Sequence, residues 1–176
     1  MYKVGDKFCY FKTKAYHKGE IKEVNLEEYK GKWLVIVSHP AAFTGVCQNE
    51  LIELAKDQNE YNKLGAHLFS VSTDSVYTLK AWVEHTPEMS NISFPMLSDS
   101  NHQITCKLGT YDENTGLSRR GTLIVNPEGV VMHVSINDYF VGRNTKEILR
   151  TLKACKYVYD NPGKVCMPNW DEELVK

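Results

Sequence analysis

A continuous apolar run, Trp33-Leu34-Val35-Ile36-Val37, constrains the fold of this chain more than any other stretch. Its β-branched residues and lack of polar interruptions are typical of a central parallel strand buried on both faces. After a short turn, mostly apolar side chains recur every three or four residues from Leu51 to Leu64, which predicts an amphipathic helix ended by Gly65. Residues 67–71 form the next predicted strand. Strand, helix and strand in this order predict a right-handed βαβ unit.

The remaining predicted elements are short and surround this unit. An antiparallel hairpin follows it, with a type I turn at Asn126-Pro127-Glu128-Gly129, and Ser75 is the expected N-cap of a second helix. Further strands or extended pieces are predicted at residues 8–11, 20–24, 94–97, 122–125 and 130–136. Further helical segments are predicted at residues 26–29, 75–85, 101–108 and 144–157, with a loop at residues 112–116.

These elements together predict an α/β protein with a mixed central β-sheet flanked by helices. That arrangement is typical of a thioredoxin-like fold, which by itself says little about function. The length of 176 residues fits a single domain over residues 1–176. From residue 160 the composition shifts to Asn, Pro, Gly and charged residues, so residues 160–176 are expected to form an extended C-terminal arm.

The charge and hydropathy of the sequence argue against nucleic acid and membranes as partners. The formal net charge is −1 and no basic block stands out, which argues against nucleic acid. No run of about 18 apolar residues exists, and residues 1–6 lack an apolar signal core. We therefore expect a cytoplasmic protein that binds neither nucleic acid nor a membrane.

Five cysteines are spread along the chain, and none forms a C-x-x-C pair or has the spacing of a zinc site. We therefore expect no metal and no cofactor. In a reducing compartment structural disulfides are rare, so most of these thiols should be reduced. The cysteines are Cys9, Cys47, Cys106, Cys155 and Cys166.

The turn between the first predicted strand and its helix carries Pro40, Thr44 and Cys47. A cysteine in the first turn of a helix faces free backbone N–H groups and the positive end of the helix dipole, which stabilise a thiolate. The alternative is an inert cysteine buried as a small hydrophobic residue, and position alone leaves both open. Thr44 either caps the helix or points its hydroxyl at a bound oxygen. Pro40 either only shapes the turn or also shields the thiolate from water.

Three motifs in order resemble those of the peroxiredoxins. Pro40-x-x-x-Thr44-x-x-Cys47 resembles the family's active-site motif, and the segment from Arg119-Arg120-Gly121-Thr122 to Gly129 resembles its second active-site segment. Residues 161–170, Asn-Pro-Gly-Lys-Val-Cys-Met-Pro-Asn-Trp, resemble the tail that carries the resolving cysteine in the typical two-cysteine branch. The likeness is strongest to the bacterial alkyl hydroperoxide reductase C type and covers essentially the whole chain.

The resemblance implies a thiol-dependent peroxidase that reduces hydrogen peroxide and organic hydroperoxides and protects the cell from oxidative stress. Cys47 is then the attacking thiolate, and the catalytic arginine is Arg120, which directly precedes the Gly-Thr pair, rather than Arg119. Thr44 and the first-turn N–H groups would assist without net charge. Glu50 is either a solvated helix residue or a partner that orients Arg120.

Arg150 is a further candidate for the network of Glu50 and Arg120, with a solvated surface position as the alternative. The resemblance further implies that Cys166 condenses with the Cys47 sulfenic acid to a disulfide. The two cysteines lie 119 residues apart (166 − 47), and in this branch the second comes from the other subunit of a homodimer. Members of the branch often form decamers, rings of five dimers. A thioredoxin-like protein or a dedicated flavin-dependent reductase would reduce the pair.

The sequence also departs from the family pattern. Ser38-His39 replaces an aromatic pair and is similar to the one-cysteine branch, with His39 expected at a turn or the surface. Ala42, Gln48-Asn49 and Met167 are further departures, and none removes a catalytic group. The chain stops soon after Trp170 without a further helix carrying a Tyr-Phe pair, which predicts resistance to over-oxidation.

Two other functional hypotheses stay open from the sequence. One is a one-cysteine peroxidase in which Cys166 is idle, and the other is a redox sensor or chaperone that passes oxidation to a partner protein. The missing C-x-x-C pair speaks against a thioredoxin-like reductase. Cys9, Cys106 and Cys155 match no motif, and we interpret them as core or surface residues without a chemical role.

Overall fold

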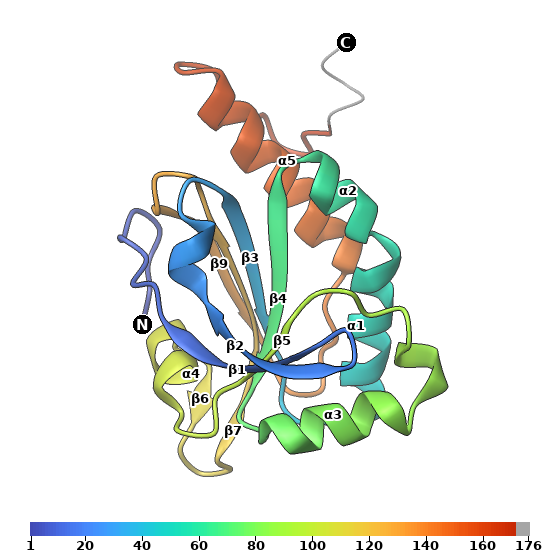
Figure 1. Ribbon diagram of the computed structural model, residues 1–176. Helices are drawn as coiled ribbons and strands as arrows, with labels where there is room; N and C mark the ends of the chain where they lie inside the picture. The colour runs from blue at the N-terminus through green and yellow to red at the C-terminus, as the bar shows by residue number, and fades with distance from the viewer. Residues whose placement is uncertain (172–176) are drawn as a thin grey trace.

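A seven-stranded mixed sheet runs through the computed structural model, which describes residues 1–171 (Figure 1). The order of its strands is β2-β1-β5-β4-β3-β8-β9. The bounds of these strands are β1 Lys12–His17, β2 Glu20–Asn25, β3 Trp33–Ser38, β4 Ala66–Ser72, β5 Met96–Ser98, β8 Arg120–Val125 and β9 Val131–Asn137. A separate small hairpin pairs β6 (Tyr111–Asp112) with β7 (Leu117–Ser118).

Five α-helices and two 3₁₀ turns accompany the strands within residues 1–171. The α-helices are α1 Gly45–Lys56, α2 Gln58–Lys63, α3 Val76–Glu84, α4 Gln103–Leu108 and α5 Thr145–Asp160. The 3₁₀ turns are η1 Leu26–Tyr29 and η2 Pro87–Met89. Within the part of the chain that is described, no helix has the length and apolar character needed to cross a membrane.

The predicted βαβ unit is confirmed and forms the centre of the sheet. All six residues of β3 are buried, and the strand pairs in parallel with β4 and antiparallel with β8. Val35, for example, lies opposite Leu68 on one side and Ile124 on the other. The predicted hairpin is also present, with Gly129 at φ 74° and its N–H donating to Asn126 O at 2.9 Å. The carboxyl end of β3 leads directly into the turn that carries Pro40, Thr44 and Cys47.

Side chains of β3 alternate between two apolar cores, one on each face of the sheet. Val35 and Val37 pack in the core beneath α1, α2, α3 and α5, whereas Leu34 and Ile36 pack in the core that α4 and η1 cover. Figure 1 shows α1, α2 and α5 on one side of the sheet and α4 on the other. Helices on both faces of a mixed sheet confirm the predicted thioredoxin-like architecture.

Two sequence-based predictions of elements were wrong. The strand expected at residues 8–11 lies at β1 instead, because Lys18 (φ 51°) and Gly19 (φ 86°) form a two-residue hairpin turn that pairs residues 12–17 with 20–25. The single helix expected up to Leu64 is divided at Asp57, whose carbonyl accepts from Glu60 N at 2.9 Å. The break lets α2 contact β4.

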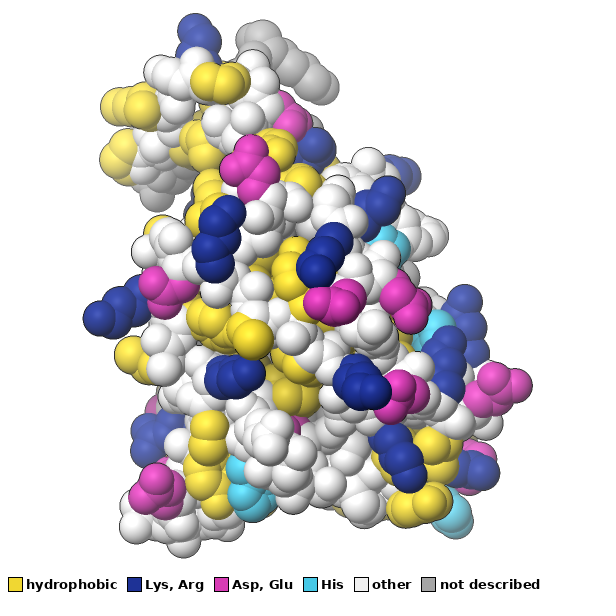
Figure 2. Space-filling model, turned by 60° about the vertical axis from the view of Figure 1, so that its left-hand side comes forward, with side chains coloured by type: hydrophobic (Ala, Val, Ile, Leu, Met, Phe, Trp, Pro, Cys, Tyr) yellow, Lys and Arg dark blue, Asp and Glu magenta, His cyan; other side chains and the backbone are white. Residues whose placement is uncertain are grey.

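One face of the molecule carries charges of both signs close to one another (Figure 2). Figure 2 shows Lys and Arg side chains interspersed with Asp and Glu on one face, without a block of a single sign. Apolar side chains show between them rather than forming a separate face in this view. The picture agrees with the small formal net charge of −1.

The start of the C-terminal arm turns back along α5. The turn is marked by Lys164 N donating to Asn161 O at 3.0 Å and by Gly163 at φ 85°. Trp170 is buried against α5, with its ring 5.5 Å from that of Tyr157. Of the predicted arm, residues 172–176 lie outside the described residues.

Candidate active site

Cys47 lies in the first turn of α1 and is fully buried. Thr44 occupies the N-cap position with extended backbone, and its carbonyl accepts from Gln48 N at 3.0 Å. The backbone N–H groups of the first turn have no hydrogen-bond partner inside the helix, so their partial positive charge stabilises a negative charge at the N-terminus of α1. The structure therefore places the sulfur where backbone donors stabilise a negative charge.

Arg120, the first residue of β8, reaches the sulfur from the neighbouring strand. Its Nη1 donates to Cys47 Sγ at 3.3 Å, and its Nε donates to Tyr139 O at 2.8 Å. The side chain is buried, whereas the adjacent Arg119 is exposed and pairs with Asp112 at 3.0 Å. Successive residues of a strand point to opposite faces, which is why only one of the two arginines can reach Cys47.

The backbone around Arg120 is held from the end of β3. Ser38 Oγ accepts from Gly121 N at 2.9 Å and donates to Arg119 O at 2.8 Å. A Cβ at Gly121 would collide with the Thr110 side chain and lie 2.9 Å from Ser38 Oγ. The glycine after Arg120 is therefore required by close packing, and it brings the arginine against the strand that leads to Cys47.

Glu50, one turn after Val46, joins Arg120 in a buried ion pair. Its Oε2 accepts from Arg120 Nη1 at 3.0 Å and from Arg143 Nη2 at 2.7 Å, and its Oε1 accepts from Arg143 N at 2.6 Å. Burial alone would raise the pKa of Glu50, but the hydrogen bonds and charges of Arg143 and Arg120 hold the pKa below its usual value. The carboxylate is therefore ionised at neutral pH and buried between two guanidinium groups.

Arg143 is a residue of the site that the sequence analysis missed. Its Nη1 donates to Gly121 O at 2.6 Å, so it links β8 to Glu50 on α1. It directly precedes Asn144, the N-cap of α5, and its side chain is almost fully buried. No pattern marks a single arginine before a helix as functional; only its position next to a helix cap is visible in the sequence.

Arg150 does not take part in this network, so that prediction was wrong. It lies on α5, where Nε and Nη2 each donate to a carboxylate oxygen of Glu147 at 2.7 Å. Its Nη1 donates to Trp170 O at 2.8 Å. The reason is distance along the helix, because Arg150 is about two turns beyond Arg143 and lies beside the C-terminal arm.

Thr44 and Pro40 lie in the turn between β3 and α1, close in sequence to Cys47. Thr44 makes no side-chain cap; its hydroxyl instead donates to Ala41 O at 2.9 Å, which leaves its lone pairs free to accept. Pro40 is buried. Asp74 fixes the turn, because its Oδ2 accepts from Ala42 N at 2.9 Å. Thr44 is exposed, so solvent reaches the turn at its hydroxyl.

His39 is fully buried, and the expected turn or surface position was wrong. It follows directly from the buried end of β3, and its ring centroid lies 5.7 Å from that of Trp82. Neither ring nitrogen has a hydrogen-bond partner. Burial, reinforced by the positive charge of Arg143, lowers the pKa of His39 to about 3. The imidazole is therefore neutral behind the active-site turn.

Cys166 lies away from Cys47 of the same chain. Its Sγ donates to Ala154 O on α5 at 3.7 Å, and the residue is half-buried. In Figure 1 the arm follows the upper end of α5, whereas α1 begins at the lower part of the molecule near α3. The two sulfurs predicted to form a disulfide are thus not brought together within one subunit. Cys9 and Cys106 are exposed thiols.

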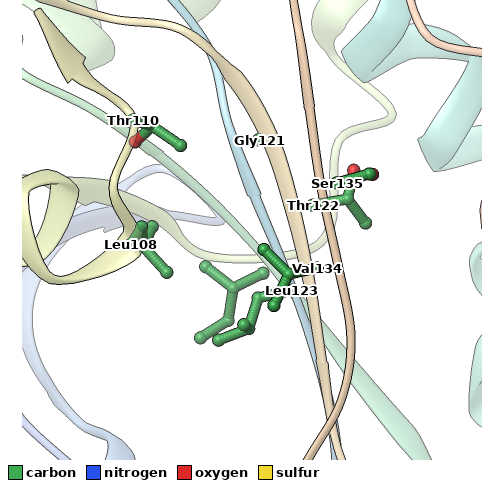
Figure 3. A pocket seen from close by; sticks show the side chains of 8 residues that line it. Leu108, Thr110, Gly121, Thr122, Leu123, Val134 and Ser135 are labelled. Atoms are coloured by element: carbon green, nitrogen blue, oxygen red, sulfur yellow. The ribbon is translucent and has the colours of Figure 1, made fainter. Parts of the chain in front are cut away.

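A small hollow beside β8 and β9 is separate from this site. Figure 3 shows Leu108, Leu123 and Val134 among the side chains that line it. Its volume is about 10 Å³, which is no more than a single water molecule needs. Among residues 1–171, no group of His, Cys, Asp and Glu side chains has an arrangement that could hold a metal ion.

Comparisons with known proteins agree with this geometry. Residues 4–134 match the AhpC/TSA family. The chain is 40% identical to alkyl hydroperoxide reductase C of Pseudomonas aeruginosa over 162 residues, which is 92% of this chain and 87% of the relative. It is 42% identical to alkyl hydroperoxide reductase C of Staphylococcus aureus over 155 residues, 88% of this chain and 82% of that relative.

Solved structures show the same relationship. The crystal structure of Enterococcus faecalis AhpC matches with a TM-score of 0.91 and 37% identity, covering 95% of this chain and all of that one. The reduced 2-Cys peroxiredoxin of Plasmodium vivax matches with a TM-score of 0.90 and 30% identity, covering 96% of this chain and 89% of that one. The buried cysteine, its arginine and these similarities lead to one conclusion: the chain belongs to the AhpC/TSA family of peroxiredoxins.

Proposed function

We propose that this protein is a thiol-dependent peroxidase that reduces hydrogen peroxide and organic hydroperoxides with Cys47 as its nucleophile. The observation that carries the proposal is the 3.3 Å contact between Arg120 Nη1 and the buried Cys47 sulfur. A fixed positive charge at that distance stabilises a thiolate in surroundings that would otherwise favour the neutral thiol. The matching relatives are named alkyl hydroperoxide reductase C, which supports a peroxide substrate.

In the first step the thiolate attacks one oxygen of the peroxide. A sulfur–oxygen bond forms, the O–O bond breaks, and the second oxygen leaves as water or an alcohol after taking up a proton. Cys47 becomes a sulfenic acid and is oxidised by two electrons. Arg120 and the first-turn N–H groups stabilise the negative charge as it moves from sulfur to the leaving oxygen. The Thr44 hydroxyl, which donates to Ala41 O, accepts a hydrogen bond from the peroxide O–H.

Glu50 and Arg143 act as positioning residues in this proposal. Arg120 is held at three points: Tyr139 O at 2.8 Å, Glu50 Oε2 at 3.0 Å and the sulfur itself. Arg143 in turn holds Glu50 through both carboxylate oxygens. A guanidinium fixed in this way needs no rearrangement when charge develops, and that preorganisation lowers the barrier.

In the second step Cys166 of the partner subunit condenses with the sulfenic acid, releasing water and forming an intersubunit disulfide. The separation of Cys47 and Cys166 within one subunit supports a partner from a homodimer, and rings of five dimers are part of this proposal. The first turn of α1 opens locally so that the buried sulfur becomes reachable. A thioredoxin-like protein or a flavin-dependent reductase then reduces the disulfide. Residues 1–176 act as one domain whose segment 160–176 is the arm.

Stopped-flow measurement of peroxide consumption tests the central claim. Cys47→Ser should abolish consumption, because an alcohol at that position is not ionised. Cys106→Ser, which replaces an exposed thiol, is the matched control and should consume peroxide normally. Normal turnover by Cys47→Ser would overturn the proposal. Cys166→Ser should consume one equivalent and form no covalent dimer on a non-reducing gel.

A further inference from the structure

The last turns of α5 and the start of the arm, which turns back along this helix, carry one cysteine each. Cys155 lies on α5, 11 residues before Cys166 (166 − 155). The chain reverses at residues 161–163, and Cys166 Sγ then lies 3.7 Å from the carbonyl of Ala154, the residue directly before Cys155. The ring of Trp170 lies 5.5 Å from that of Tyr157, so the returning segment runs along α5. The two thiols are therefore neighbours within one subunit.

Electrostatics support this proximity. Burial and, to a smaller extent, the negative charge of Cys166 raise the pKa of Cys155 to about 11, although the Arg150 guanidinium opposes both. The negative charge of Cys166 in turn contributes to the raised pKa of Arg150. Such mutual effects require that Cys155, Cys166 and Arg150 lie in one cluster. Cys155 packs at the edge of the apolar core and is half-buried, so a small opening of the arm exposes it.

We propose that Cys155 is a third redox-active cysteine that takes over the Cys47–Cys166 disulfide, an inference that rests on the proposed peroxidase function. The Cys155 sulfur attacks Cys166 Sγ of its own subunit. The Cys155–Cys166 bond forms, the Cys47–Cys166 bond breaks, and Cys47 leaves as a thiolate while Cys155 gives up its proton to solvent. No net oxidation occurs, because one disulfide replaces another. Cys47 is free to react with a second peroxide before any external reductant arrives.

The direction of this exchange follows from the different surroundings of Cys47 and Cys155. A stabilised thiolate is the better leaving group, and Arg120 at 3.3 Å stabilises Cys47 when it departs. Attack by a thiol that lies close to Cys166 in the same subunit also has a high effective concentration compared with an external thiol. The repulsion that Cys155 feels from Cys166 disappears once Cys166 is bonded. Burial of Cys155 slows the exchange at neutral pH and makes its rate rise with pH.

Disulfide mapping by mass spectrometry tests the exchange directly. Wild-type protein receives less than one equivalent of hydrogen peroxide, and samples are quenched over time, alkylated and digested with trypsin without reduction. Cleavage after lysine separates Cys47 (residues 33–56), Cys155 (residues 154–156) and Cys166 (residues 165–176) into different peptides. The cross-link between peptides 33–56 and 165–176 should form first and then give way to one between 154–156 and 165–176.

The variant Cys155→Ser should keep the first cross-link and its covalent dimer band through the whole time course. Cys155→Ala is a second variant without a hydroxyl in the apolar surroundings, and Cys106→Ser is the matched control that should behave like wild type. The wild-type exchange rate should rise roughly tenfold per pH unit below the pKa of Cys155.

Peroxide consumption, followed in the same samples, separates the two proposals. If peroxide is consumed normally but the Cys47–Cys166 cross-link persists equally in wild type and Cys155→Ser, the exchange is overturned and the peroxidase function is not. Absence of peroxide consumption by the wild type overturns the peroxidase function and the exchange together. Appearance of the second cross-link in the wild type and its loss in both Cys155 variants supports the exchange.

Discussion

The two cysteines of the proposed peroxidase cycle, Cys47 and Cys166, lie in opposite kinds of surroundings. Cys47 is fully buried, receives a hydrogen bond from Arg120 and sits on a helix whose Glu50 is locked to two arginines. Cys166 is half-buried, and its sulfur makes one long contact to a carbonyl at 3.7 Å. The cysteine proposed to react with peroxide is held in a fixed electrostatic environment. The cysteine proposed to react with another sulfur lies on an irregular segment with few hydrogen bonds to the rest of the molecule, so it can leave its place at little cost.

Replacing Arg120 should reduce the rate of peroxide consumption more than any other substitution considered below. It would show whether the guanidinium beside the sulfur is what activates Cys47. Arg120→Met keeps much of the side-chain volume but removes the donor to sulfur. We expect the rate of peroxide consumption to fall by about 100- to 1000-fold, since one lost preorganised donor costs that much elsewhere. Arg119→Met, which removes only an exposed pair, is the control in the same stopped-flow assay. Equal effects of the two substitutions would contradict the assignment.

Glu50→Gln should show how much stability depends on the buried network. It leaves two buried guanidinium groups without their carboxylate, which costs about 3 kcal/mol in the free energy of unfolding. Urea denaturation measures the loss. Glu53→Gln, which breaks an exposed pair with Lys56, should change the free energy by less than about 0.5 kcal/mol. A Glu50 variant as stable as the Glu53 variant would show that the network carries no stability.

His39 makes the Cys47 end sensitive to acid. Its folded pKa is about 3 and its unfolded pKa is ordinary, so below about pH 6.5 the unfolded chain binds one proton more than the folded chain. Stability therefore falls as the pH drops from 6.5 toward 3, by up to about 1.4 kcal/mol per pH unit. Denaturation of His39→Phe over this range should show a flatter profile than wild type. His85→Phe, at an exposed position, should keep the wild-type slope.

Arg150→Ala should have the smallest effect of these substitutions and should change only the docking of the C-terminal arm that carries Cys166. It removes the hydrogen bond to Trp170 O, worth about 1 kcal/mol of arm docking. Limited proteolysis at Lys164 should become faster, while the first reaction of Cys47 with peroxide stays unchanged. Lys156→Ala, which loses only an exposed pair with Asp160, controls for loss of positive charge. A slower reaction of Cys47 with peroxide in the Arg150 variant would show that the arm and the Cys47 site are coupled, contrary to this prediction.

Local sequence signals predicted the central part of the fold well. The apolar run of β3, the helical spacing after Cys47 and Gly65 placed the βαβ unit correctly, because burial on both faces and helix periodicity are encoded locally. The strand β1 was misplaced, because Lys12-Thr13-Lys14 is polar and its pairing depends on the Lys18-Gly19 turn. Hairpin register is set by turn geometry, which apolar patterns do not reveal.

The candidate site was predictable only where residues belong to a motif. The resemblance to the family motifs assigns Cys47, Thr44 and Arg120 to one site, and the structure places Arg120 of β8 beside the sulfur. Arg143 was not predictable, since its partner Glu50 is 93 residues away and only tertiary packing joins them. The burial of His39 was missed because a histidine after a strand gives no sign of which side chains cover it.

The alternating charges around Cys47 also have a consequence for the oxidised enzyme. With Cys47 as a thiolate, two anions face two arginines, and the buried group is electrically neutral. Conversion of the thiolate to sulfenic acid removes one negative charge and leaves the same pocket with an excess of +1, since Glu50 then balances only one of Arg120 and Arg143. An unbalanced buried charge is costly. In the proposed cycle, oxidation of Cys47 therefore destabilises the charges around the first turn of α1, so the arrangement that stabilises this turn before the reaction favours its opening afterwards.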